Sequence, residues 1–456
     1  MDDALLKRSA LLIATLASFL TPYMVSSMNI ALPAIGAEFH MSAVLMSWVP
    51  TSYLLAAAVF LVPFGRLADI FGRKRIFSYG MWVFTVSSLL LAFSPSSAVL
   101  IGLRTLQGFG SAMIFGTGMA ILTSVYPVGE RGRVLGINVA AVYLGLSLGP
   151  VLGGFLTQQF GWRSIFLVNV PLGMLVIVLV AATLKREWAE AKGERFDLVG
   201  SVIYSLTLVT LMFGFSLLPA WTGMACILLG MIGTTAFAVW ETKTENPLLN
   251  MDLFMHNTVF AFSNLAALIN YSATFAVTFL MSLYLQYIKG FTPQHAGMVL
   301  ISQPIVMALF SPISGRLSDR IEPRVVSSIG MGFTAAGLFL FTGLDRDTHL
   351  AFIVAGLVLL GFGFALFSSP NTNAVMSAIE KRYYGVGSAT LGTMRLVGQM
   401  LSMGIAMVIF AFHIGGARIT PEYYPQFLTS AKTAFIIFAV LCCGGIFASL
   451  ARGKVR

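Results

Sequence analysis

The sequence predicts an all-α integral membrane protein, and its composition, its apolar runs and the distribution of its charges all support this. Of the 456 residues, 57% are hydrophobic and 10% are charged, and the mean hydropathy is +0.86. Soluble domains average about 45–50% apolar and about 25% charged residues. A water-soluble fold of this length could not bury so much apolar surface. The composition therefore excludes soluble enzymes, nucleic-acid-binding proteins and disordered chains.

Apolar runs long enough to cross a bilayer occur fourteen times along the chain. A spanning helix needs about 20 apolar residues. We expect spans near residues 9–33, 45–64, 76–93, 98–125, 134–158, 164–184, 198–217, 222–240, 257–287, 296–313, 325–342, 351–376, 385–412 and 431–451. A short turn alone joins 198–217 to 222–240, and the count would be twelve if that pair were re-entrant or peripheral.

The basic residues predict the orientation of these spans. With a cytoplasmic N-terminus, 21 of the 28 Lys and Arg residues fall in cytoplasmic loops, five in external loops and two within spans. Basic residues are retained on the cytoplasmic side. We therefore expect a multi-pass protein of the cell (inner, cytoplasmic) membrane with both termini in the cytoplasm. The bases are scattered between apolar runs, whereas binding to nucleic acid needs a contiguous basic patch.

Two stretches repeat 250 residues apart. Residues 65–75 read GRLADIFGRKR, and residues 315–324 read GRLSDRIEPR. Internal repeats are typical of secondary transporters, whose substrate site lies at the repeat interface. We expect an N-terminal six-helix bundle at 1–184, a cytoplasmic linker plus two inserted spans at 185–256, and a C-terminal six-helix bundle at 257–456. The polar stretch 185–197 is the expected hinge segment.

Three motifs, in chain order, resemble those of the major facilitator superfamily. Residues 65–75 are similar to its motif A, departing at Ile70, where a base is usual; residues 103–110 (LRTLQGFG) resemble motif B, and residues 145–154 (GLSLGPVLGG) resemble the antiporter motif C. Residues 160–163, 169–171 and 246–249 are similar to stretches of the fourteen-span drug:proton antiporter (multidrug efflux) family. The resemblance covers nearly the whole chain. It implies a major facilitator fold, in which two extra helices are inserted between two six-helix bundles.

The resemblance assigns a gating role to motif A and its repeat. The residues concerned are Gly65, Asp69, Gly72, Arg73, Lys74, Gly315, Arg316 and Asp319. In the family, Asp69 would bond the start of a helix in the opposite half, where the helix dipole favours an anion, and Arg73 would join a charge network. The alternative is that these glycines and bases only satisfy the needs of a tight cytoplasmic turn.

Motif C predicts close helix packing. Gly145, Gly149, Gly153 and Gly154 share one helix face, and small residues at this spacing let helices approach closely. A kink at Pro150 and a smooth glycine face would permit sliding between states. The family associates this motif with export.

Arg104 and Arg395 are the two charges placed inside spans. Such charges are functional by default, although each could instead be a static strut bonded to helix-end carbonyls. In the family, the motif B arginine is implicated in proton movement. All 18 carboxylates map to loops or span edges, and Met24 stands where the family's first span commonly carries Asp. This argues against ordinary carboxylate-based proton coupling and against a preference for quaternary cations.

Polar and sulfur-containing side chains within the apolar runs are candidates for a substrate cavity. They are Met24, Asn29, Gln107, Asn264, Asn270, Tyr284, Gln303, Asn371, Asn373 and Gln399. Hydrogen bonds between helices are the alternative role for each of them. With the two arginines they describe an amphipathic pocket that suits a neutral or anionic amphiphile.

We therefore expect a secondary active transporter that exports small amphipathic compounds by alternating access, driven by a proton gradient. One alternative is a transporter of a specific neutral or anionic metabolite or lipid-like substrate without conventional coupling, and a second is a membrane sensor or enzyme.

We expect no catalytic set, metal or cofactor, and the absence of a Walker loop argues against direct use of ATP. The expected partners are the bilayer and a small molecule. We expect a monomer, and the short external loops give no indication of an adaptor protein.

Overall fold

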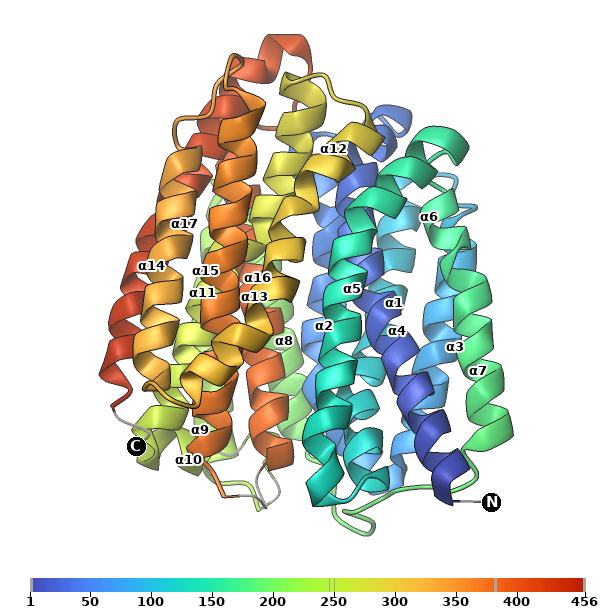
Figure 1. The fold of residues 1–456 in the computed structure, drawn as a ribbon. Coiled ribbons are helices and arrows are strands. Elements are labelled where there is room, and N and C mark those ends of the chain that lie inside the picture. Colours follow the sequence, from blue (N-terminus) through green and yellow to red (C-terminus); the bar gives the residue numbers. More distant parts are fainter. Residues whose placement is uncertain (1–2, 246, 250, 381–383, 454–456) are drawn as a thin grey trace.

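The computed structural model describes residues 3–245, 247–249, 251–380 and 384–453, and helices dominate them (Figure 1). The first bundle contains α1 (Asp3–Glu38), α2 (Ala43–Phe71), α3 (Arg73–Leu91), α4 (Ser97–Val125), α5 (Val128–Phe160), α6 (Ser164–Leu167) and α7 (Asn169–Thr183). The inserted pair is α8 (Leu198–Leu217) and α9 (Trp221–Glu241). The second bundle contains α10 (Met251–His256), α11 (Thr258–Leu283), the π-helix η1 (Tyr284–Ile288), α12 (Pro293–Leu300), α13 (Ser302–Ser318), α14 (Pro323–Phe341), α15 (Leu350–Ser377), α16 (Tyr384–His413), the 3₁₀-helix η3 (Pro421–Tyr423) and α17 (Tyr424–Ala451).

The helices agree with the fourteen predicted spans. Thirteen helical segments in the described part of the chain are long and apolar enough to cross a membrane. The remaining predicted span, 76–93, is α3, whose mean hydropathy is lowered because Arg73, Lys74 and Arg75 open the helix. All fourteen segments therefore have helical counterparts.

Two predicted spans are interrupted, and proline explains each break. Pro171 has no N–H for the carbonyl of Leu167, where α6 ends, and Pro304 has none for the carbonyl of Leu300, where α12 ends. Because proline has no N–H, the carbonyl four residues before it loses its helical hydrogen bond. The expected spans 164–184 and 296–313 are consequently the pairs α6–α7 and α12–α13.

Both ends of the helical assembly lie at one face. α1 begins and α17 ends at the lower face in Figure 1, which we call the terminal face, and we call the opposite one the distal face. At the distal face, the end of α1 is clamped to the α5–α6 turn, where Arg163 donates to both carboxylate oxygens of Glu38 at 2.7 and 2.8 Å. These bonds raise the pKa of Arg163 above its usual value.

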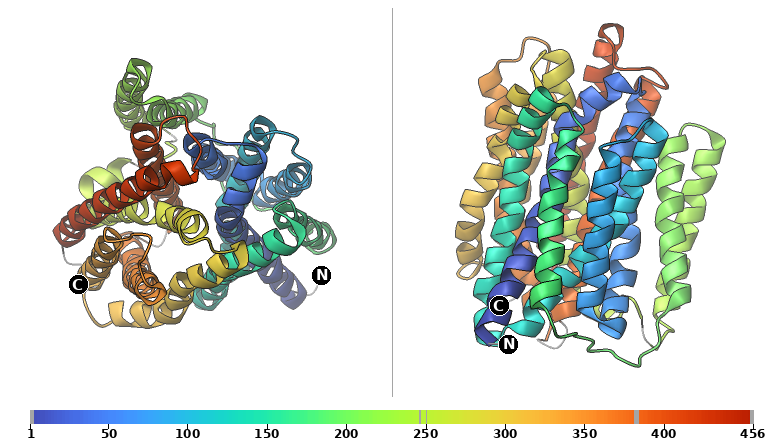
Figure 2. Two further views of the ribbon diagram at one scale, coloured as in Figure 1. Left: turned by 90° about the horizontal axis from the view of Figure 1, so that it is seen from above. Right: turned by 90° about the vertical axis from the view of Figure 1, so that its right-hand side faces the viewer.

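The inserted helices form a hairpin at the periphery of the molecule (Figure 2). Its α8 packs against both α2 and α16. The Tyr204 hydroxyl donates to the Ala58 carbonyl at 2.9 Å, and Leu208 and Met212 join Met400 in one buried apolar cluster. The hairpin thus covers the line along which α2 of the first bundle meets α16 of the second.

Hydrogen bonds join the two bundles at the distal face. The pairs are Ser282 Oγ to Asn29 O (2.6 Å), Gln286 Nε2 to Ile30 O (3.0 Å), Ala43 N to Ala417 O (3.2 Å), Arg418 Nη1 with His40 Nδ1 (3.1 Å) and Gln294 N to Gln158 Oε1 (3.3 Å). We call these five contacts the distal closure. Three of them hold α1 and the end of α5 against the end of α11, η1 and the start of α12, and the other two join the α1–α2 turn to the loop that follows α16.

Candidate functional site

The motif A segment is mostly helical. Residues 65–71 form the last turns of α2 and residues 73–75 open α3, so the turn itself is Gly72. Gly72 has φ of 120°, and a Cβ there would lie 2.4 Å from Glu187 Cδ. Only glycine tolerates both this backbone conformation and this contact.

Arg73 is the centre of a charge network at the terminal face. Its Nε donates to Asp69 Oδ1 at 2.8 Å, and its Nη1 donates to Ser124 Oγ at 2.6 Å. The two Nη groups also bind both oxygens of Glu190 at 2.8 and 3.0 Å. Bidentate pairing of this kind is geometrically specific. The predicted charge network is therefore present, and an acid from the linker contributes to it.

The linker lies across motif A as a strap, which we define as residues 187–194. Arg73 N donates to Trp188 O and Ala191 N donates to Asp69 O, each at 2.9 Å. Glu187 accepts from Lys74 N at 2.8 Å, and Glu194 pairs with Arg66. Most of the predicted hinge segment is thus bound to the first bundle.

The expected bond from Asp69 to a helix in the opposite half is not among the contacts of the described residues. The described bonds of Asp69 are to the Arg73 side chain and the Ala191 N–H. Residues 381–383, just before α16, lie outside the described part of the chain. The latch role of Asp69 stays a prediction.

The second copy of motif A is bonded differently. Gly315 and Arg316 lie in the last turns of α13, and Asp319 caps that helix. Asn373 of α15 donates to Ser318 Oγ at 3.0 Å and to Asp319 Oδ1 at 3.4 Å. An amide from the same bundle thus contacts this copy, in contrast to the linker acids that bind the first.

The motif C glycines form a seam on α5. Cβ atoms at Gly145, Gly149 and Gly153 would lie 2.5 to 2.7 Å from Phe19 O, Ser26 Cβ and Ser27 Cα of α1. The Ser26 and Ser27 hydroxyls donate across this contact to the carbonyls of Leu146 and Gly149, each at 3.1 Å. The backbones of α1 and α5 therefore touch without intervening side chains.

The same helix also meets the second bundle. A Cβ at Gly154 would lie 2.5 Å from Pro293 O, and one at Gly297 would lie 2.1 Å from Pro150 O. α5 is therefore packed closely on two sides, against α1 in its own bundle and against α12 in the other. The sequence did not predict a packing role for Gly297, because its neighbour Pro150 lies 147 residues away in the chain.

Arg104 is fully buried and held by neutral groups. Its Nε donates to Val49 O at 3.2 Å, its Nη1 donates to the Gln107 carbonyl oxygen, and its guanidinium lies 4.4 Å from the Tyr53 ring centroid. Gln107 in turn donates to Ser88 Oγ at 2.8 Å. Among the described residues no carboxylate pairs with Arg104, which matches the predicted alternative of a strut.

Arg395 is in a different environment. It lies about three turns into α16 and is partly exposed. Its Nη2 donates to Thr372 Oγ1 at 2.9 Å, and its guanidinium lies 5.6 Å from the Tyr271 ring centroid. Its buried Nε has no partner among the described residues. Arg395 therefore keeps donor capacity that a ligand could use.

The structure gives six of the ten cavity candidates a structural partner. These contacts are Gln107 with Arg104, Asn264 with Phe260 O, Tyr284 with Asp345 O, Asn371 with Arg452, Asn373 with Ser318, and the Met24 sulfur with Asn169. Asn29, Asn270, Gln303 and Gln399 remain. Of these, Asn270 is fully buried, and its amide oxygen and nitrogen both lack a partner in the described residues. The next residue of α11, Tyr271, contacts Arg395 of α16.

The sequence analysis missed the burial of three charged residues. Arg452, predicted as a cytoplasmic charge, is 0% exposed and donates to Asn371 Oδ1 at 2.9 Å and to Pro323 O at 3.0 Å. Asp197 and Glu241 are also buried and converge on Gly200 at the base of the inserted hairpin. Asp197 could be identified as a helix N-cap before an apolar run, but no local signal marks its burial. Both acids lie at span edges, as predicted.

No group of three His, Cys, Asp or Glu in the described ranges could hold a metal ion.

Comparisons with known proteins add independent information. Residues 14–240 and 264–454 match the family model described as Major Facilitator Superfamily. The chain is 29% identical over 441 residues to riboflavin transporter RibZ of Clostridioides difficile (strain 630), covering 96% of this chain and 95% of that one. It is 31% identical to multidrug resistance protein Stp of Mycobacterium tuberculosis (strain CDC 1551 / Oshkosh), covering 84% and 72% of the two chains. It is 30% identical to the tetracenomycin C resistance and export protein of Streptomyces glaucescens, covering 85% and 72%.

Among solved structures, a mutant of the peptide transporter POT in complex with alafosfalin superposes with a TM-score of 0.71 at 14% identity. The match covers 99% of each chain. At that identity the likeness concerns the fold alone.

The seam on α5 yields a stability prediction. We expect Gly145→Ala to lower the melting temperature of the purified protein, because its Cβ would lie 2.5 Å from the Phe19 carbonyl oxygen and overpacking costs about 1–3 kcal/mol. Gly136→Ala on the same helix is the matched control, since a Cβ there meets nothing within 4 Å. Equal melting temperatures for the two variants would contradict the proposed close contact.

The strap yields a second prediction, measured by limited trypsin digestion. Glu190→Gln removes the charge that binds both Nη groups of Arg73, and hydrogen bonds to charged groups contribute about 1.5–3 kcal/mol. We expect cleavage after Lys192 and Arg195 to become at least about fivefold faster, because proteolysis follows the open population. Glu422→Gln, an exposed acid on the distal face, should leave the rate unchanged. A strap that is cleaved equally fast in both variants would show that Glu190 does not hold it.

Proposed function

Because this chain belongs to the Major Facilitator Superfamily, we propose that it exports small amphipathic compounds across the cytoplasmic membrane by alternating access, with a proton gradient as the energy source. The observation that carries the proposal is the two-sided glycine seam on α5. It places backbone against backbone at the junction of the two bundles, where a rocking motion needs smooth surfaces.

The distal closure has a strength that suits a transport cycle. Five hydrogen bonds of about 0.5–1.5 kcal/mol each amount to several kcal/mol. A membrane potential supplies about 2.3 kcal/mol per charge per 100 mV. The closure is therefore strong enough to define a state, and opening it needs the energy of about one to three charges moved through 100 mV, or new contacts that replace it.

The basic residues support the orientation. By the topology predicted from the sequence, 21 of the 28 Lys and Arg residues fall in loops on the same side as the termini. Basic residues are retained on the cytoplasmic side, so the proposal places the terminal face and both termini in the cytoplasm. The distal closure then seals the external side, and the molecule acts as a monomer.

The substrate class follows from the chemistry around Arg395. A partly exposed arginine with an unpartnered Nε, next to the aromatic face of Tyr271, favours a neutral or anionic amphiphile over a cation. The relatives named as multidrug resistance and tetracenomycin C export proteins support export of such compounds.

A second candidate is transport of one specific neutral or anionic metabolite without carboxylate-based coupling. The relative named as a riboflavin transporter matches over 95% of its length. The two arginines within the spans lack a paired carboxylate among the described residues, which also fits a neutral heteroaromatic substrate.

Transport in proteoliposomes with an imposed pH gradient tests the proposal. We expect anionic and neutral fluorescent amphiphiles to accumulate in a pH-dependent manner and to drive proton flux. An Ala43→Cys/Ala417→Cys variant joins two positions whose backbones are hydrogen-bonded at 3.2 Å, so its disulfide should stop transport and reductant should restore it. The background for this variant lacks Cys443, which is exposed.

The outcomes separate the two candidates. Broad transport coupled to protons supports the exporter, whereas transport of riboflavin alone without proton flux supports the second candidate. Undiminished transport by the oxidised double-cysteine variant would argue against alternating access.

Arg395 provides a specificity prediction in the same assay. We expect Arg395→Met to lower kcat/KM for an anionic amphiphile by roughly tenfold, equivalent to about 1.4 kcal/mol, and to leave a neutral one nearly unchanged. Arg395→Lys keeps the charge and should retain most of the anionic activity. An equal loss for both substrates in the Met variant would assign Arg395 a structural role.

A further inference from the structure

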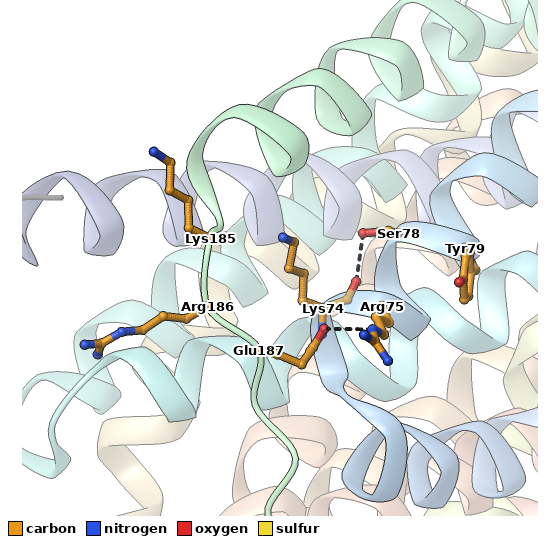
Figure 3. A pocket seen from close by; sticks show the side chains of 7 residues that line it. All are labelled: Lys74, Arg75, Ser78, Tyr79, Lys185, Arg186 and Glu187. Carbon is orange, nitrogen blue, oxygen red and sulfur yellow. Dashed lines mark hydrogen bonds and ion pairs between the residues drawn. The ribbon is translucent and has the colours of Figure 1, made fainter.

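A hollow on the terminal face lies away from the junction of the two bundles. A cavity of about 310 Å³ opens on the terminal face, between the start of α3 and the chain that leaves α7. Its lining consists of Lys74, Arg75, Ser78, Tyr79, Lys185, Arg186 and Glu187 (Figure 3). The proposed transport cycle does not use it.

The cavity is strongly basic. Four cationic side chains line it against one carboxylate. That carboxylate is already engaged, because Glu187 accepts from Lys74 N at 2.8 Å and lies 3.9 Å from Arg75 Nε. In Figure 3, Lys74 and Lys185 extend in the same direction from opposite sides of the opening, whereas Arg186 points away from α3. The arrangement favours an anion.

A second hollow of about 260 Å³ adjoins the first and shares Lys74 and Ser78 with it. It runs between α3 and α7, and the rest of its lining is apolar: Met81, Trp82, Ile177, Val180 and Ala181. A free phosphate ion would bind in the basic hollow but would leave this apolar hollow empty. A molecule that carries both an anionic group and a hydrocarbon chain fits both.

Aromatic side chains place these hollows at the boundary of the membrane. Tyr79 and Trp82 are 59% and 47% exposed on α3, and such residues are enriched where hydrocarbon meets water. Tyr79 lines the basic hollow and Trp82 lines the apolar one, so the basic hollow lies at the level of lipid head groups. Basic pockets between spanning helices at this level bind anionic lipid head groups.

We propose that these joined hollows bind an anionic glycerophospholipid, with its phosphodiester among Lys74, Arg75 and Lys185 and an acyl chain between α3 and α7. With the orientation proposed above, the lipid belongs to the cytoplasmic leaflet. The test of this proposal measures lipid binding alone, so a negative result in the transport assay would not contradict it.

The test compares lipids bound to the purified full-length protein in detergent by native mass spectrometry. We expect dioleoyl phosphatidylglycerol to bind at least about fivefold more tightly than dioleoyl phosphatidylcholine, as the attraction of each base for an anionic head group implies. Lys185→Gln/Arg186→Gln should weaken phosphatidylglycerol binding about tenfold and leave phosphatidylcholine unchanged. Lys192→Gln/Arg195→Gln removes the same charge from exposed positions of the same linker and should have no effect.

The acyl part of the proposal has its own variant. Ala181→Trp fills the apolar hollow without changing any charge and should weaken phosphatidylglycerol binding by several-fold. Millimolar inorganic phosphate should compete poorly. Equal affinity for the two lipids, equal losses in the two charge variants, or full displacement of lipid by inorganic phosphate would overturn the proposal.

Discussion

Helices inside a bilayer gain little hydrophobic energy by leaving lipid for one another, so close packing of their backbones must hold them together. In this molecule α5 meets that constraint on two sides. Its glycines touch α1, and its Gly154 and Pro150 contact Pro293 and Gly297 of the second bundle. The internal stability of the first bundle and the fit between the bundles thus depend on the same helix. Larger side chains in place of these glycines would push α5 away from both α1 and α12.

Buried charge is the second demand that the membrane imposes, and three arginines meet it differently. Arg73 is bound by acids, one of which the linker supplies. Arg104 and Arg452 are surrounded by carbonyls, hydroxyls and amides. Neutral partners keep a cation in place without cancelling its charge, so the interior of the first bundle retains a fixed positive field around Arg104.

The helices could be predicted because a spanning segment needs length and apolarity, both of which are local properties. The helix breaks before Pro171 and Pro304 could not be predicted with certainty, since Pro150 lies inside the unbroken α5. Contacts across long sequence distances were beyond prediction. The strap acid Glu190 and the buried Arg452 have no local signature, because their environments are made by residues 117 and 81 positions away. Gly72 was found as part of a motif, but its role against Glu187 needed the structure.

The inserted hairpin makes the two flanks of the molecule unequal. It packs over the line where α2 meets α16, and Phe215 reaches Gly404 beneath it. Along the other flank, where α5 meets α12 and α13, no inserted helix of the described chain lies on the outside. On that flank the junction is sealed by the direct contact of α5 with α12, whereas on the opposite flank the hairpin covers it. The hairpin thus gives the two sides of a nearly twofold arrangement different neighbours, protein on one flank and the surrounding lipid on the other.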